Sequence, residues 1–157
     1  SDDRETGVSL MQIDTEVDHG PLIAVSSFPL ESEMTAPVLE TKSALIGAQL
    51  IAENIDEYIH GTGTKKEQDH TAATFTKKIQ KSDGVLDESL SDWGKWKRYR
   101  AYLPWPGVSM IVKKDDLPVR VKITKAHYVN GAFTPDEYIP ENGKPLSESQ
   151  FKQWLSS

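Results

Sequence analysis

A polar segment from His60 to His70 limits the fold most strongly, because it separates two stretches with different patterns. The segment reads HGTGTKKEQDH and contains no large apolar side chain. Such a composition is typical of a linker between domains. The 157 residues suffice for one ordinary domain or two small ones. We therefore predict a first domain over 1–60, a linker over 61–70 and a second domain over 71–157.

The stretch before this segment has the pattern of an α/β domain. Short apolar runs predict strands at Val8–Ile13 and Leu22–Phe28. Apolar residues at helical spacing then predict an amphipathic helix over Ala36–Ile59. Thr35 is placed to act as its N-cap, and Gly61 is placed to end it. The order strand, loop, strand, helix predicts the tail of an α/β domain.

The stretch after the segment predicts a small β domain with helices. We expect a helix over Ser91–Tyr102 and strands at Val108–Val112 and Val119–Ile123. In the second strand apolar side chains alternate with Arg and Lys, which is typical of a strand buried on one face. A capping box at Ser147 predicts a terminal helix through Trp154. The pattern indicates a small barrel or a half-covered sheet with basic side chains outward.

The net charge of −6 is unevenly distributed along the chain. Residues 64–125 hold 14 Lys and Arg against 8 Asp and Glu, so the middle is basic and both ends are acidic. A phosphate backbone would meet that local charge, although a solvated charged surface has the same composition. The candidate phosphate contacts are Lys77, Lys78, Lys81, Lys95, Lys97, Arg98 and Arg100.

The chain contains no cysteine. This excludes disulfides and thiolate zinc sites, and it fits a reducing cytosol. No apolar stretch approaches the roughly 20 residues of a membrane span, so we expect no membrane association. The chain opens on Ser1 and a charged run, and we expect it to be part of a longer protein.

An acidic loop follows the first predicted strand and contains Asp14, Glu16 and Asp18. In open α/β sheets ligands bind at the carboxyl ends of strands, where a carboxylate can orient a histidine or accept a proton. By spacing alone, a solvated acidic loop is the commoner explanation, and His19 is more often a surface residue. A metal site built from Asp14, Asp18 and His19 lacks the spacing of known sites, and we set it aside.

A stiff turn contains Trp105 between Pro104 and Pro106, followed by Gly107. Because both prolines fix the backbone, the turn aims the tryptophan side chain in one direction. We expect Trp105 to close the core of the second domain. A role in stacking on nucleic-acid bases is the alternative.

Blocks along the whole chain resemble known enzymes. Residues 5–14 (ETGVSLMQID) and 17–20 (VDHG) are similar to the late catalytic-domain motif of folate-dependent formyltransferases. Later blocks resemble the linker and C-terminal domain of the methionyl-tRNA formyltransferase family, in the same order. These blocks are residues 68–70 (QDH), 73–75 (ATF), 78–79 (KI), 83–84 (DG), 100–107 (RAYLPWPG) and 140–147 (PENGKPLS).

The resemblance implies a fold and a reaction. The fold is the tail of a Rossmann-like formyltransferase domain, followed by a small OB-like β-barrel that contacts tRNA. The reaction moves a formyl group from 10-formyltetrahydrofolate to the amino group of initiator methionyl-tRNA, and it requires no metal. The resemblance further implies a cytoplasmic enzyme of translation initiation that is monomeric when full length.

The resemblance also implies roles for individual residues. By motif position Asp18 is the catalytic carboxylate, which orients and charge-stabilises a histidine and helps to manage the proton of the attacking amine. The loop formed by Asp14, Thr15, Glu16 and Val17 is implied to lie beside the pterin. The implied tRNA contacts are Lys77, Lys78, Lys81, Lys97, Arg98 and Arg100.

The chain departs from the family pattern in several places. Glu16 replaces a glycine and Pro21 replaces an acid, which affects the conformation of the loop rather than its chemistry. Lys95 replaces an apolar residue, and Trp93 or Trp96 can fill that space. The family's Asn, its His and its Ser-Leu-Leu-Pro folate loop precede the first block and do not occur in this chain. We therefore expect the isolated chain to have no transferase activity.

Two other functions remain open from the sequence. One is a formyltransferase that acts on a nucleotide sugar, or a formyltetrahydrofolate hydrolase-type domain, since these share the Asp18 loop. The basic middle of the chain favours tRNA over those substrates. The other is a non-catalytic RNA-binding module that uses the basic residues between Lys77 and Lys125.

Overall fold

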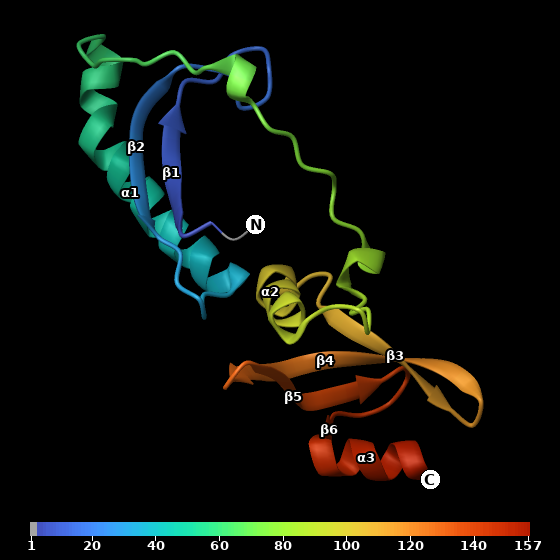
Figure 1. Ribbon diagram of the computed structural model, residues 1–157. Helices are drawn as coiled ribbons and strands as arrows, with labels where there is room; N and C mark the ends of the chain where they lie inside the picture. Colours follow the sequence, from blue (N-terminus) through green and yellow to red (C-terminus); the bar gives the residue numbers. More distant parts are fainter. Residues whose placement is uncertain (1–2) are drawn as a thin grey trace. The chain divides into compact units, whose positions relative to one another are not determined.

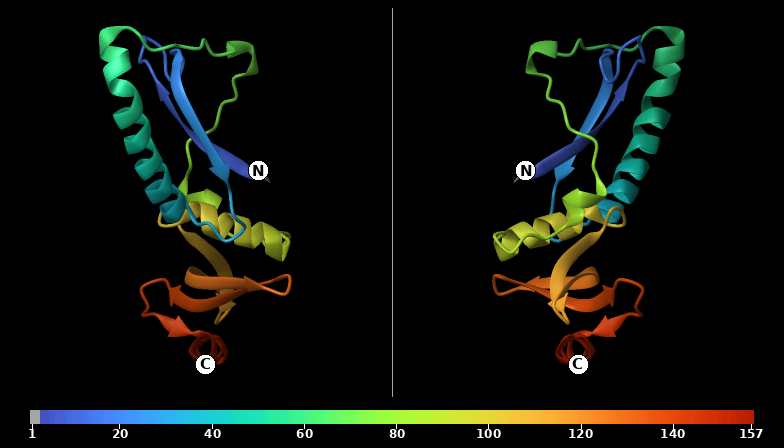
Figure 2. Two further views of the ribbon diagram at one scale, coloured as in Figure 1. Left: turned by 90° about the vertical axis from the view of Figure 1, so that its left-hand side faces the viewer. Right: turned by 90° about the vertical axis from the view of Figure 1, so that its right-hand side faces the viewer.

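The computed structural model describes residues 3–157, and the chain divides into two compact units (Figures 1 and 2). The first unit extends to Lys77, and the second runs from Lys78 to Ser157. Buried side chains occur in both units. Phe28 and Leu50 are buried in the first, and a larger set of aromatic and aliphatic side chains is buried in the second.

The first unit is a two-stranded antiparallel ribbon that packs against one long helix. Strand β1 (Glu5–Met11) pairs with β2 (Leu22–Pro29). Helix α1 (Ala36–His60) runs alongside both strands (Figures 1 and 2). Gly7 permits close pairing of the strands, since a Cβ at that position would lie 2.8 Å from the carbonyl oxygen of Ser26. The predicted order of strand, loop, strand and helix is confirmed.

The first strand differs from its prediction at both ends. It begins at Glu5 rather than Val8 and ends at Met11, two residues before Ile13. The pairing register shifts between Leu10 and Met11, so the chain leaves the ribbon there. Ile13 is consequently exposed to solvent.

Helix α1 begins at Ala36 as predicted and ends at His60, one residue beyond the predicted end. Gly61 follows it in the left-handed conformation, with a φ of 68°. Thr35 occupies the N-cap position, but its side chain makes no cap hydrogen bond. Pro37 accounts in part for this, because an N-cap side chain bonds to an N–H in the first helical turn and proline has none.

The segment predicted as a linker contacts the ribbon. Lys66 exchanges two backbone hydrogen bonds with Leu22, each 2.8 Å long, so it extends the pairing of β2. A 3₁₀ turn (His70–Ala72) follows. This part of the chain therefore belongs to the first compact unit.

The second unit is a four-stranded antiparallel meander with helices at its two ends. The strands are β3 (Val108–Lys114), β4 (Leu117–Val129), β5 (Ala132–Pro140) and β6 (Leu146–Ser147), paired in that order. The helices are α2 (Asp92–Tyr102) and α3 (Glu148–Ser156). The strands lie between the two helices (Figure 1).

The described strands of this unit form an open sheet, not the closed barrel that we expected. Closure requires the two edge strands to pair with each other. Strand β6 has only two residues and pairs with β5 alone. On the other edge, Val85 bridges to Ser109 of β3, and Leu86 donates a backbone hydrogen bond to the same residue.

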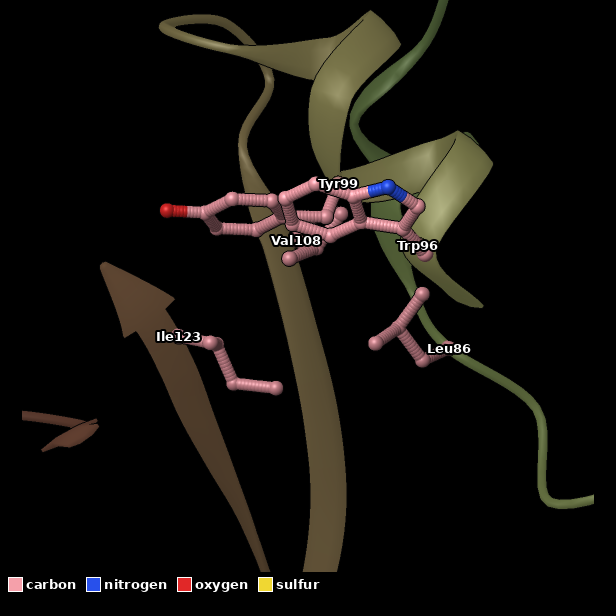
Figure 3. Close-up of a cluster of buried hydrophobic side chains, with 5 residues drawn as sticks. All are labelled: Leu86, Trp96, Tyr99, Val108 and Ile123. Atoms are coloured by element: carbon pink, nitrogen blue, oxygen red, sulfur yellow. The ribbon is translucent and has the colours of Figure 1, made fainter. Parts of the chain in front are cut away.

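The larger core cluster lies under helix α2. Figure 3 shows the rings of Trp96 and Tyr99 lying over Val108, with Leu86 and Ile123 beside them. Trp96 is only 5% exposed. It therefore provides apolar packing on α2, the helix on which Lys95 replaces an apolar residue of the family pattern. The buried Ile123 confirms the predicted alternation in β4.

A second cluster lies under helix α3. It contains Val121, Tyr138 and Phe151, and the rings of the last two stack with centroids 4.1 Å apart. The predicted capping box is confirmed, because Ser147 and Gln150 each bond to the other's backbone N–H. The cap thus places Phe151 against the sheet.

Trp105 does not close the core, which corrects the expectation from the sequence. Its side chain is 54% exposed. Trp96 and Tyr99 already fill the space under α2, so the tryptophan of the turn is left at the surface.

Across residues 3–157 no helix combines the length and apolarity needed to cross a membrane.

Val121→Ala is expected to lower the free energy of unfolding of the second unit by about 2 kcal/mol, because it leaves a cavity where two methyl groups were fully buried. Val129→Ala on the same strand is the control, since Val129 is exposed. Urea unfolding followed by tryptophan fluorescence measures the effect, because every tryptophan lies after residue 77. Equal midpoints for the two variants would contradict the assignment of the core.

Candidate active site

The loop between β1 and β2 brings the predicted site residues together. It closes through a hydrogen bond of 3.0 Å from the backbone N–H of Gln12 to the carbonyl of Pro21. Gly20 is required at this closure, because a Cβ there would lie 1.8 Å from the carbonyl oxygen of Gln12. The acidic residues of the loop are exposed to solvent.

Asp14 and His19 form a close pair within the loop. The ring nitrogen Nδ1 of His19 lies 2.7 Å from one carboxylate oxygen of Asp14, and the backbone N–H of Glu16 donates to the other at 2.9 Å. The hydrogen bond from His19, aided by the one from Glu16, lowers the pKa of Asp14. In return, the hydrogen bond to Asp14 raises the pKa of His19. The loop therefore contains a histidine that retains its proton to higher pH.

Asp18 adopts the left-handed conformation, with a φ of 54°. Aspartate is one of the few residues other than glycine that tolerate this region. Its side chain is exposed, while its backbone carbonyl accepts a hydrogen bond of 3.0 Å from the side-chain amide of Gln68. The same amide donates to the carbonyl of Gly20 at 2.7 Å. Gln68 thus fixes the backbone on both sides of His19.

The residues around Gln68 add further contacts to the loop. The ring of His70 stacks on that of His19, with centroids 3.7 Å apart and planes 8° apart. Asp69 caps the 3₁₀ turn by accepting from the backbone N–H of Thr71 at 3.0 Å. Residue spacing did not indicate these contacts. The only signal in the sequence was the resemblance of residues 68–70 to the family's linker.

A hollow of about 360 Å³ lies beside the start of the loop, between the ribbon and α1. Its lining is mostly apolar, and neither Asp18 nor His19 contributes to it. The lining residues are Leu10, Met11, Gln12, Ile13, Ile23, Ile51, Asn54, Ile55 and Tyr58. Within the part of the chain that the structure describes, no group of three or more His, Asp or Glu side chains is arranged to hold a metal ion.

The residues predicted to contact tRNA differ in exposure. Lys77, Lys78 and Lys81 are exposed, whereas Lys97, Arg98 and Arg100 on α2 are half-buried.

The arginines of α2 contribute to packing. The guanidinium group of Arg98 donates to the carbonyl of Val85 at 3.2 Å. The guanidinium group of Arg100 lies over Trp93 and Trp96, 5.7 and 5.8 Å from the ring centroids.

Known proteins resemble this chain, although no family model matches it. A methionyl-tRNA formyltransferase of Roseiflexus sp. (strain RS-1) is 38% identical over 117 residues, which are 74% of the chain and 36% of that relative. One from Streptococcus pyogenes serotype M28 (strain MGAS6180) is 30% identical over 144 residues, 92% of the chain and 45% of that relative. Over most of its length the chain is homologous to methionyl-tRNA formyltransferases. It spans less than half the length of these two relatives.

Solved structures show the same fold. Methionyl-tRNA formyltransferase from Clostridium thermocellum matches with a TM-score of 0.60 at 15% identity, over 92% of this chain and 57% of that chain. HypX from Aquifex aeolicus, in complex with tetrahydrofolic acid, matches with a TM-score of 0.68 at 16% identity, over 94% of this chain and 30% of that chain. The chain therefore carries its Asp18 loop on a formyltransferase fold.

Gln68→Ala is expected to loosen the Asp18 loop, because it removes both side-chain hydrogen bonds to the loop carbonyls. Two such bonds predict that backbone amides of residues 12–21 exchange about tenfold faster. Hydrogen–deuterium exchange with mass spectrometry measures this rate. Gln49→Ala on the exposed side of α1 is the control. Unchanged exchange in Gln68→Ala would show that the amide does not hold the loop.

Asp14→Asn is expected to lower the pKa of His19, because the hydrogen bond to Asp14 is the main cause of its elevation. The imidazole would then lose its proton at a lower pH than in the unaltered chain. Asp18→Asn is the matched control, since Asp18 is not among the groups that raise this pKa. NMR titration of the His19 ring provides the measurement, and an identical pKa in Asp14→Asn would refute the pairing.

Proposed function

We propose that this chain is part of a methionyl-tRNA formyltransferase that transfers a formyl group from 10-formyltetrahydrofolate to the amino group of initiator methionyl-tRNA. The observation that carries the proposal is 38% identity over 117 residues to a protein of that name. The closed Asp18 loop supports it, because a carboxylate is held at the end of a strand where ligands bind in such folds.

The proposed chemistry assigns Asp18 one part of a larger site. The methionyl nitrogen attacks the formyl carbon, the bond from that carbon to the folate nitrogen breaks, and the proton of the amine passes to the folate nitrogen. Asp18 orients a histidine supplied by the rest of the enzyme and stabilises its positive charge. The backbone of Asp14, Thr15, Glu16 and Val17 lies beside the pterin of the donor.

We assign residues 1–60 to the end of the catalytic domain, 61–70 to the linker, and 71–157 to a domain that binds tRNA. The second domain is then an open member of the OB-like group. The residues that we propose as tRNA contacts are Lys77, Lys78, Lys81, Lys97, Arg98 and Arg100. The complete enzyme is proposed to act as a monomer in the cytoplasm, without a membrane and without a metal.

Apolar side chains on α1 support a larger catalytic domain. Val38, Leu45 and Ile59 are each more than half exposed, although α1 already packs on the ribbon. An exposed apolar side of a helix marks a surface that another element covers. The remainder of the proposed catalytic domain would cover these side chains and supply the family's Asn and His.

Asp18→Asn in the complete enzyme is expected to lower kcat for formyl transfer at least 100-fold, because the histidine loses its charged partner. The KM for the donor should change by no more than a few-fold. Formation of formylmethionyl-tRNA from 10-formyltetrahydrofolate is the measurement. Asp116→Asn is a matched control, since Asp116 is also exposed and has a positive φ of 64°.

The result separates the proposal from its alternatives. A non-catalytic RNA-binding module predicts no turnover in the unaltered enzyme and no effect of Asp18→Asn on tRNA binding. A formyltransferase with another acceptor predicts turnover with a nucleotide sugar and none with methionyl-tRNA. Either result would reject the proposed reaction.

A further inference from the structure

A second hollow, of about 290 Å³, lies in the second unit between the Pro-Trp-Pro turn and strands β3 and β4. It differs from the Asp18 loop in chemistry, because its polar lining is mainly basic and it includes an aromatic ring. Its polar and aromatic lining residues include Lys81, Trp105, Ser109, Arg120, Lys122 and Glu141.

Trp105 forms one wall of this hollow and is 54% exposed. The turn that carries it is closed by a hydrogen bond of 2.9 Å from the backbone N–H of Gly107 to the carbonyl of Tyr102. Pro104 and Pro106 restrict the backbone on both sides of the ring. A fixed and exposed indole offers a face on which a nucleic-acid base can stack.

Arg120 lies inside the hollow in a fixed orientation. Its Nε donates to the hydroxyl of Ser109 at 2.9 Å, and one of its terminal nitrogens, Nη2, donates to the carbonyl of Lys81 at 3.4 Å. Ser109 is almost fully buried, so it is a rigid partner. Among residues 3–157, no acidic side chain pairs with Arg120, and its positive charge is available to a ligand.

Lys81 and Lys122 add two more positive charges. Within the described part of the chain neither forms an ion pair. Other lysines of the same unit do, namely Lys95, Lys113, Lys114, Lys125 and Lys152. Lys122 lies against the turn of Trp105, because a Cβ on Gly107 would be 3.1 Å from its Cε atom. The cations and the exposed ring thus share one site.

Glu141 is the single carboxylate of the lining. Its backbone N–H donates to the carbonyl of Arg120 at 2.9 Å. This bond places Glu141 beside β4, the strand that carries Arg120. A carboxylate opposes a simple anion, but it accepts hydrogen bonds from a base amino group or a ribose hydroxyl. The hollow therefore suits a ligand with an aromatic face, a negative charge and hydrogen-bond donors. A nucleotide has all of these.

We propose that this hollow binds one unpaired nucleotide of an RNA, with the base stacked on Trp105 and the phosphate held by Lys81, Arg120 and Lys122. Its volume is close to the lower limit of small-ligand sites, which fits a single nucleotide. The identity of the RNA as tRNA rests on the proposed function, whereas the chemistry of the hollow does not.

The test uses the complete enzyme with two probes, fluorescein-labelled initiator tRNA and the free mononucleotide CMP. Trp105→Ala is expected to weaken tRNA binding about tenfold, because one stacked base is lost. Trp105→Phe should keep most of the affinity, since a phenyl ring also stacks. Quenching of tryptophan fluorescence by tRNA should nevertheless be smaller in Trp105→Phe. Circular dichroism checks that each variant is folded.

One lysine of the hollow, Lys122, is tested against a lysine outside it. Lys122→Ala is expected to weaken tRNA binding and to lower the slope of log affinity against log salt by about one. Lys113→Ala removes the same charge from the other end of β3, and its affinity should stay within about twofold. Equal effects of the two variants would overturn the assignment of the hollow.

The remaining outcomes also decide the proposal. Unchanged affinity in folded Trp105→Ala would overturn it, as would an unaltered enzyme that binds CMP at this site but no RNA, or that binds neither probe. Formyl transfer is measured separately on the same samples. If Trp105-dependent RNA binding persists without any transfer, the proposed reaction is wrong and the proposed nucleotide site is supported. If transfer occurs and Trp105→Ala binds tRNA normally, only the proposed nucleotide site is wrong.

Discussion

The conformation of the Asp18 loop depends on one side-chain amide. Gln68 donates hydrogen bonds to the carbonyls of Asp18 and Gly20, and it lies in a segment that also pairs with β2 through Lys66. The carbonyl of Gly20 is partly buried and needs such a partner. The amide therefore keeps Asp18 in its left-handed conformation and holds His19 between two fixed points. The segment after α1 acts as the support of the candidate active site as well as a connection to the second unit.

Local signals were sufficient to predict several elements. The ends of α1 follow from Pro37 and Gly61, because both residues act through their own backbone conformation. The alternation around Ile123 predicts a strand buried on one face, and the capping box at Ser147 predicts the start of α3. Each of these signals lies within a few residues of the feature that it predicts. The family was also predictable, because matching blocks occur along the whole chain.

Features that depend on distant residues were not predictable. Nothing near Trp105 indicates that Trp96 fills the core instead, and nothing near Asp18 indicates its bond to Gln68. The open sheet results from a β6 of two residues and from the bridge on β3, which only tertiary structure reveals. Strand β5 was missed for another reason. Asn130 and the following glycine have positive φ angles and form the hairpin turn, a local signal that was available.

We propose that the Asp18 loop forms part of a folate-dependent formyl-transfer site. A crystal structure of the complete enzyme with 5-formyltetrahydrofolate tests it most directly. We expect the pterin to lie beside the backbone of residues 14–17 and the Asp18 carboxylate to contact a histidine facing the formyl group. A pterin bound elsewhere, or an Asp18 side chain that points away from the donor and from any histidine, would contradict it.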